Sequence, residues 1–241
     1  MGEGSGHMQV AKLGGGRRAY RLVTAIVILA VLGLVPAGAA LASHTRSHHR
    51  KIHRRIPRIA APLYHAELLE DADSGRILYQ YNPDLPWPPA SMAKMMLLLV
   101  TEEQIKAGRL KLTDPVVISA RSAHTGGSRL GLREGQVYPL GELIKAALIR
   151  SANDAAVAIG QKVGGGSIDT TVRMMNARAK SLGMTGTHYN TVDGLPPTPG
   201  HDVDVTDARD LATVARALIQ ETDLLRWSAM EAALFDGGVA I

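Results

Sequence analysis

The pattern of apolar and polar residues changes twice along the first sixty positions of the chain. Residues 22–35 form an uncharged apolar run, and residues 43–58 contain many cations and almost no apolar side chain. From about residue 61 onward, short strand-like runs and longer helix-like segments alternate with loops rich in Gly and Pro. This pattern predicts one folded domain over residues 61–241, preceded by two segments of other kinds.

Strand-like runs open the predicted domain. Residues 64–70 and 76–81 contain Leu, Ile and Tyr, and the turn-forming sequence DADSG at 71–75 separates them. This arrangement predicts a β-hairpin. A shorter apolar run at residues 116–119 predicts one further strand.

Helix-like segments make up most of the remaining domain. The first opens just after Pro89, is rich in Met, Leu and Ala, and ends before Gly108, as expected for a buried helix. Thr206 is placed to cap the last helix at its N-terminus. The five predicted helices are residues 92–107, 140–150, 153–163, 168–182 and 206–220. Hairpin strands combined with several helices predict an α+β fold.

Composition limits the chemistry of the domain. The 241 residues are 46% hydrophobic but only 4% aromatic, so the core must consist mainly of Ala, Val, Leu, Ile and Met side chains. The chain contains no cysteine, which excludes disulfides, thiol catalysis and cysteine-based zinc sites. Nothing in the sequence calls for a metal ion or an organic cofactor.

The positive charge of the chain belongs to its first sixty residues. The formal net charge is +5, but residues 1–42 carry +3 and residues 43–60 carry +6, which leaves −4 on residues 61–241. A slightly acidic domain offers no basic face for phosphate groups. We therefore expect no nucleic-acid partner.

Residues 1–42 have the layout of a secretory signal peptide. Three arginines precede the apolar run, and Ala40-Leu41-Ala42 forms an Ala-x-Ala cleavage site. An uncleaved membrane anchor is the alternative, although Pro36 interrupts the run short of the roughly 20 apolar residues of a span. Both interpretations place the domain outside the cytoplasm, in the periplasm or at the outer face of the cytoplasmic membrane.

Residues 43–60 form a basic linker with six Arg or Lys residues and no acid. Such a segment has too little apolar surface to bury, so we expect a disordered tether. The tether either contacts anionic lipid or wall polymer, at up to ~1 kcal/mol per cation, or serves as a solvated spacer.

Ser91 and Lys94 form the first candidate catalytic pair. They stand three positions apart at the start of the first predicted helix, so their side chains share one helix face. A lysine among apolar neighbours can lose its proton and act as a base toward the serine hydroxyl. The positive end of the helix favours the serine alkoxide and the oxyanion that follows. Taken alone, the Ser-x-x-Lys spacing also fits a helix cap and a surface lysine.

A second candidate, Ser151-Ala152-Asn153, lies where two predicted helices meet. The Ser151 hydroxyl can relay a proton between Lys94 and a leaving group. The Asn153 amide can bind a substrate carbonyl and hydrogen-bond the lysine. An ordinary helix cap is the plainer interpretation of the same three residues.

Three stretches in order carry a resemblance to a known family. They are SGRILYQYNPDLPWPPASMAKMM, GGSRLGLREGQVYPLGELIKAALIRSANDAAVAI and MNARAKSLGMTGTHYNTVDGL. From residue 64 to about residue 220, the chain resembles the D-alanyl-D-alanine carboxypeptidases of peptidase family S11, the low-molecular-mass penicillin-binding proteins. The resemblance implies a serine β-lactamase or DD-peptidase-like α+β fold, with a helical cluster and an antiparallel sheet.

The resemblance also implies an activity, the removal of the terminal D-alanine from peptidoglycan stem peptides through an acyl-enzyme. Ser91 matches the acylated serine, and Lys94 matches its general base. Ser151 matches the serine that assists proton transfer, and Asn153 matches a residue that touches the substrate. Peptidoglycan stem peptides are the implied substrate, and β-lactams are the implied covalent inhibitors.

The third motif of the family, Lys-Thr-Gly, does not occur after the other two in this sequence. The similar His124-Thr125-Gly126 precedes Ser151 and matches the glycine-containing loop of the family instead. We therefore expect a catalytic domain that is incomplete at its C-terminus, with strands of the sheet missing. One alternative is a non-catalytic or penicillin-binding-only member of the family. The other is a class A β-lactamase, whose Glu-x-x-Leu-Asn loop is not found after Ser151.

Overall fold

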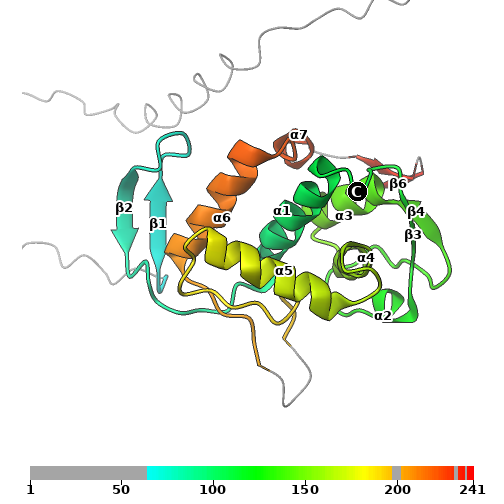
Figure 1. Cartoon of the computed structure of the whole chain (residues 1–241), viewed down its shortest axis with the longest axis horizontal. Coiled ribbons are helices and arrows are strands. Elements are labelled where there is room, and N and C mark those ends of the chain that lie inside the picture. The colour runs from blue at the N-terminus through cyan, green and yellow to red at the C-terminus, as the bar shows by residue number, and fades with distance from the viewer. Residues whose placement is uncertain (1–63, 197–201, 231–232, 237) are drawn as a thin grey trace, which may run out of the picture. The chain divides into compact units, whose positions relative to one another are not determined.

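The computed structural model describes residues 64–196, 202–230, 233–236 and 238–241 (Figure 1). The predicted leader (1–42) and the predicted basic linker (43–60) lie outside these residues, so both stay predictions. Within the described ranges, no helix has the length and apolar character that a membrane span requires.

Helices dominate the described part of the chain, and its strands form three two-stranded antiparallel sheets. The helices are α1 (Ala93–Lys106), α2 (Ala120–Ala123), α3 (Leu140–Ile149), α4 (Asn153–Val163), α5 (Ile168–Ser181), α6 (Ala208–Glu221) and α7 (Leu225–Ser228). The strands are β1 (Glu67–Glu70), β2 (Ile77–Tyr81), β3 (Pro115–Val117), β4 (Val137–Pro139), β5 (Leu234–Phe235) and β6 (Val239–Ala240). Pairing joins β1 to β2, β3 to β4, and β5 to β6. This mixture confirms the predicted α+β class.

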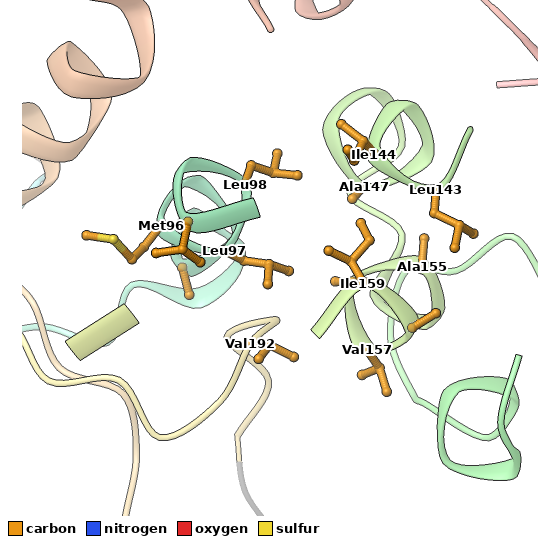
Figure 2. Packing of buried hydrophobic residues seen from close by; sticks show 14 of the residues in the cluster. Met96, Leu97, Leu98, Leu143, Ile144, Ala147, Ala155, Val157, Ile159 and Val192 are labelled. Carbon is orange, nitrogen blue, oxygen red and sulfur yellow. The ribbon is translucent and has the colours of Figure 1, made fainter. Parts of the chain in front are cut away.

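The central helix of the domain is α1, which packs against α3, α4, α5 and α6 (Figure 1). Residues 96–100 of α1 are all buried. A helix that is apolar all round lies inside a core rather than at its surface. Figure 2 shows Leu97 and Leu98 on the side of α1 that faces Ile144 of α3 and Ile159 of α4. The residues at the start of α1 are therefore anchored on the buried core of the domain.

The predicted hairpin is present as β1 and β2, although β1 begins three residues later than expected. The Asp71 carboxylate closes the turn by accepting hydrogen bonds from the backbone N–H and the hydroxyl of Ser74. Helix α6 packs against β1, and Arg216 of α6 forms an ion pair with Glu70 at 3.0 Å. The strand predicted at 116–119 is present as β3. It pairs with β4, which has three residues, ends in proline and was not predicted from the sequence.

The N-cap of α6 is Asp207, and the prediction of Thr206 is wrong. The Asp207 carboxylate accepts a hydrogen bond from the Asp210 backbone N–H at 2.8 Å. Thr206 is engaged elsewhere, because its backbone pairs with Trp87 through two hydrogen bonds. Its hydroxyl also lies 2.8 Å from the hydroxyl of Thr187. Contacts with distant residues therefore shift the N-cap of this helix by one position.

The sequence does not predict α2, α7, β5 and β6. Each of them has only two to four residues. Helical periodicity needs a longer window, and strand alternation needs at least about four residues. The five long helices, by contrast, begin and end within two residues of their predicted limits.

Candidate active site

Ser91 lies in the short 3-10 turn η2 (Ala90–Met92), which leads directly into α1. The residue before it, Ala90, has a positive φ of 48°, a conformation that costs a non-glycine residue roughly 1–3 kcal/mol. At Ala90 the chain turns from the proline-rich segment 83–89 into the helix. Ser91 is exposed, whereas Lys94 is buried. The site therefore joins a solvent-accessible serine to a buried lysine.

Lys94 Nζ donates hydrogen bonds to Ser91 Oγ at 3.1 Å and to the main-chain oxygen of Asp193 at 2.9 Å. Only 3% of Lys94 is exposed. Burial lowers the pKa of Lys94, and the negative charge of the Asp193 carboxyl group partly opposes this shift. A lysine with a lowered pKa is neutral more of the time, so its lone pair can accept the serine proton.

The segment Ser151–Asn153 joins α3 to α4. Ser151 has a positive φ of 53°, and Asn153 is the first residue of α4. Asn153 Nδ2 donates a hydrogen bond to the main-chain oxygen of Gly126 at 2.9 Å. The backbone N–H of Asn153 donates to the main-chain oxygen of Ser128 at 2.8 Å. The glycine loop, which we define as residues 126–132, therefore holds Asn153 in place.

The hydrogen bond predicted between Asn153 and Lys94 is not formed. The asparagine amide donates to Gly126 instead, and the hydrogen bonds of the lysine go to Ser91 and Asp193. Asn153 Oδ1 is buried and has no hydrogen-bond partner within the described residues. Buried acceptors without a partner are uncommon in proteins, so this oxygen is an exception within the site.

A second loop, the active-site turn of residues 191–195, connects the two halves of the site. Gly194 has a φ of +78° and packs so closely on Ala90 that a Cβ would overlap the Ala90 carbonyl oxygen. The leucine that follows Gly194 lies against Gly127 of the glycine loop, and Gly127 itself lies against the Asn153 amide. The active-site turn therefore contacts the serine side of the site directly and the asparagine side through Gly127.

Asp154 is a residue of the site that sequence reasoning missed. It is fully buried, and its carboxylate accepts hydrogen bonds of 2.9–3.2 Å from the backbone N–H groups of residues 130–132. These bonds replace the water that the carboxylate loses on burial. An acid in the first turn of a helix is common, so nothing in the sequence distinguished this one.

Asp193 was also missed, because it binds Lys94 through a main-chain oxygen that every residue possesses. The sole local signal is the Asp193-Gly194 dipeptide, which marks a turn. A turn signal does not tell which distant side chain the turn contacts.

An accessible serine hydrogen-bonded to a buried lysine, at the start of the central helix of an α+β domain, is typical of the penicillin-binding class of serine enzymes. Comparison with known proteins gives the family more closely. The family description "D-alanyl-D-alanine carboxypeptidase", peptidase S11, matches residues 54–235. The chain belongs to this family, which confirms the predicted family and its DD-peptidase-like fold.

Individual relatives agree with this assignment. D-alanyl-D-alanine carboxypeptidase DacA of Escherichia coli (strain K12) is 36% identical over 172 residues, which are 69% of this chain and 41% of that protein. The crystal structure of D-alanyl-D-alanine carboxypeptidase DacD from Francisella tularensis matches with a TM-score of 0.68 and 28% identity, over 75% of this chain and 43% of that one. Penicillin binding protein 6B from Escherichia coli matches with a TM-score of 0.66 and 29% identity, over 75% and 58%. The chain spans about half the length of these relatives.

Proposed function

We propose that this protein is a serine-type D-alanyl-D-alanine carboxypeptidase that removes the terminal D-alanine from peptidoglycan stem peptides. The observation that carries the proposal is the 3.1 Å hydrogen bond between Lys94 Nζ and Ser91 Oγ at the start of a buried helix. The name of the relative from Escherichia coli supports the same reaction.

In the first step, neutral Lys94 accepts the proton of the Ser91 hydroxyl, and Ser91 Oγ attacks the carbonyl carbon of the penultimate D-alanine. A C–O bond forms, and the C–N bond to the terminal D-alanine then breaks. The leaving amine takes up the proton from Lys94 through the hydroxyl of Ser151. The products of this step are an acyl ester on Ser91 and free D-alanine.

In the second step, Lys94 accepts a proton from water, and the resulting hydroxide attacks the ester carbon. Ser91 Oγ leaves and recovers its proton, which releases the shortened peptide. Asn153 binds the substrate in both steps through its side-chain amide, whose groups can donate a hydrogen bond to a peptide carbonyl and accept one from a peptide N–H.

β-Lactams follow the first step, because their strained amide carbonyl is attacked by the same oxygen and the acyl group stays on Ser91. The name of penicillin binding protein 6B, a structural relative, supports this part of the proposal. β-Lactams should therefore act as covalent inhibitors.

The organisation of the rest of the chain is part of the proposal. Residues 1–42 direct export, and the domain from residue 61 onward acts in the periplasm or at the outer face of the membrane. The six cations of residues 43–60 contact anionic lipid or wall polymer.

Release of D-alanine from a synthetic peptide that ends in D-Ala-D-Ala tests the proposed activity. The wild-type protein should release one D-alanine per peptide, and Ser91→Ala should release none above background because the nucleophile is lost. Ser228→Ala, which changes an exposed serine at the end of α7, should behave as wild type. Absence of release by folded wild-type protein, or release that survives Ser91→Ala, contradicts the proposal.

A further inference from the structure

We infer that the carboxyl group of Asp193 sets the protonation of Lys94 and thereby the pH range in which Ser91 can be acylated. Asp193 is a positioning residue in this role, since its side chain acts through Lys94 rather than on the substrate. The inference rests on the proposed function of Ser91 and Lys94.

The backbone of the active-site turn holds Asp193 beside Lys94. Thr191 is anchored to the buried Asp204 carboxylate, to which it donates from its backbone N–H at 2.9 Å and from its hydroxyl at 2.6 Å. The backbone N–H of Gly194 donates to Thr191 Oγ1 at 2.9 Å. With Thr191 and Gly194 held on either side of it, the main-chain oxygen of Asp193 lies 2.9 Å from Lys94 Nζ. The carboxyl group of the same residue is held by the turn as well, because its Oδ1 accepts a hydrogen bond from the Leu195 backbone N–H at 3.2 Å.

The carboxyl group and the amine interact in a shielded environment. Asp193 is 6% exposed, and the two side chains form no direct ion pair within the described structure. Charges that are shielded from water interact more strongly than exposed charges at the same separation. Among the described residues, the charges of Lys94 and Asp204 influence the pKa of Asp193, and the charge of Asp193 influences the pKa of Lys94.

The direction of each influence follows from the sign of the charge. Burial lowers the pKa of Lys94, whereas ionised Asp193 raises it. Burial raises the pKa of Asp193, while the backbone N–H of Leu195 and the charge of Lys94 lower it. Lys94 must be neutral to accept the serine proton. Loss of the Asp193 charge should therefore allow acylation at lower pH.

Asp193→Asn tests this inference with the least disturbance. The asparagine Oδ1 can still accept the hydrogen bond that Leu195 N–H donates to Asp193 Oδ1 at 3.2 Å. The rate of acylation by a fluorescent penicillin is measured from mildly acidic to alkaline pH. The midpoint of the rising limb should move down by about one pH unit in the variant.

Three further variants separate charge from structure. Asp193→Ser is also neutral and keeps an acceptor, so its midpoint should fall as in Asp193→Asn. Asp193→Glu keeps the charge and should keep the wild-type midpoint within a few tenths of a unit. Asp202→Asn removes an exposed carboxylate and should leave the midpoint unchanged.

An unchanged midpoint in either folded neutral variant overturns the inference, and so does a downward shift in Asp193→Glu. A purely structural role would lower the rate at every pH without moving the midpoint.

Direct NMR titration of Lys94, with ¹³C-labelled lysine and assignment by Lys94→Arg, needs no catalytic activity. If the wild type is never acylated, the proposed function fails while the coupling of Asp193 to Lys94 is still measured. If no neutral variant folds, the wild-type Lys94 signal must still respond to the ionisation of Asp193, and a signal that does not respond overturns the inference.

Discussion

Backbone strain lies next to the candidate nucleophile and at the candidate proton relay. Ala90 and Ser151 are two of the four non-glycine residues with positive φ in the described chain. Each such conformation costs roughly 1–3 kcal/mol and persists only where the surroundings enforce it. Gly194 packs on Ala90, and the hydrogen bond from Ala152 N–H to the Ala146 oxygen closes the turn around Ser151. The site is therefore held in shape before any substrate binds.

At the same scale, Gly127→Ala should impair acylation more than Gly126→Ala does. Gly127 has a φ of +71°, and a Cβ there would lie 2.7 Å from Asn153 Nδ2. The substitution should strain the loop and displace the amide, which we expect to slow acylation about ten-fold or more. The Cβ position of Gly126 is open, so Gly126→Ala is the matched control. Rates with a fluorescent penicillin measure both variants, and equal rates would count against this role of the glycine loop.

Among the secondary-structure elements, the start of α4 depends on one buried carboxylate. Asp154 binds the backbone of residues 130–132, and its main-chain oxygen accepts a hydrogen bond from the Ser122 hydroxyl at 2.6 Å. These bonds tie the glycine loop and α2 to the first turn of α4. They therefore position Asn153 as well as stabilising the domain.

Asp154→Ala should lower the thermal stability of the domain strongly. The substitution leaves three backbone N–H groups without their acceptor, at about 1–3 kcal/mol for each buried one. A total loss of ~3 kcal/mol corresponds to a fall in Tm of roughly 6–12 °C for a domain of this size. Circular dichroism measures the transition, and Asp169→Ala, an exposed acid in the first turn of α5, is the control. A similar, small decrease in both variants would contradict the prediction.

Helix α6 begins with two buried acids, Asp207 and Asp210. Burial, together with repulsion from Asp210 and Asp84, raises the pKa of Asp207. An acid whose pKa is higher in the folded state is destabilising when ionised, so stability decreases as pH rises through the pKa of the folded state. Ionisation of Asp207 is therefore less favourable for stability at neutral pH than a neutral side chain at the same cap would be.

Asp207→Asn should raise the Tm at neutral pH, because asparagine caps a helix equally well without the charge. Relief of ~1 kcal/mol corresponds to about 2–4 °C. The advantage should disappear below the ordinary pKa of aspartate, about 3.9, where the wild-type residue is also neutral. Thermal denaturation of both proteins over a pH series measures this, and a variant that is less stable than wild type at neutral pH would contradict it.

The sequence predicted long elements well and the contacts between elements poorly. Helix α4 has its predicted limits because Asn153 opens an apolar segment and Gly164 closes it. The cap of α6 was misplaced because a bridge to Trp87, far away in the chain, occupies Thr206. Local signals report local hydrogen bonds, and they cannot report a partner that the fold supplies from elsewhere.

Across the whole domain, the candidate site also combines a local contact that the sequence predicts with distant contacts that it does not. The pairing of Ser91 with Lys94 was predictable because three positions on one helix fix their separation. The contact of Lys94 with Asp193 was not, because 99 positions separate the two residues. The same applies to Asn153 and Gly126, which are 27 positions apart. Only the folded chain brings these groups together.

The β1–β2 sheet lies at one side of the domain, with β2 as its outer strand (Figure 1). Leu69, Leu78 and Tyr79 on these strands are about half exposed, and β2 pairs only with β1 in the described part of the chain. Exposed apolar side chains on an edge strand favour association between molecules.

Leu78→Lys should therefore reduce concentration-dependent association while leaving the Tm within about 1–2 °C of wild type. Analytical ultracentrifugation over a concentration series measures the association. Lys180→Leu, which adds an apolar residue at an exposed position of α5, is a useful opposite control. Equal association of wild type and Leu78→Lys would show that this edge is not involved.

Mass spectrometry of the intact protein after incubation with benzylpenicillin shows directly whether Ser91 is the nucleophile. We expect a single added mass equal to that of the penicillin, located by peptide mapping on Ser91 and lost in Ser91→Ala. Lys94→Ala should slow its formation by about 10²–10⁴, the usual contribution of a general base. A folded wild-type protein that gains no adduct, or gains one at another residue, would show that Ser91 is not the nucleophile.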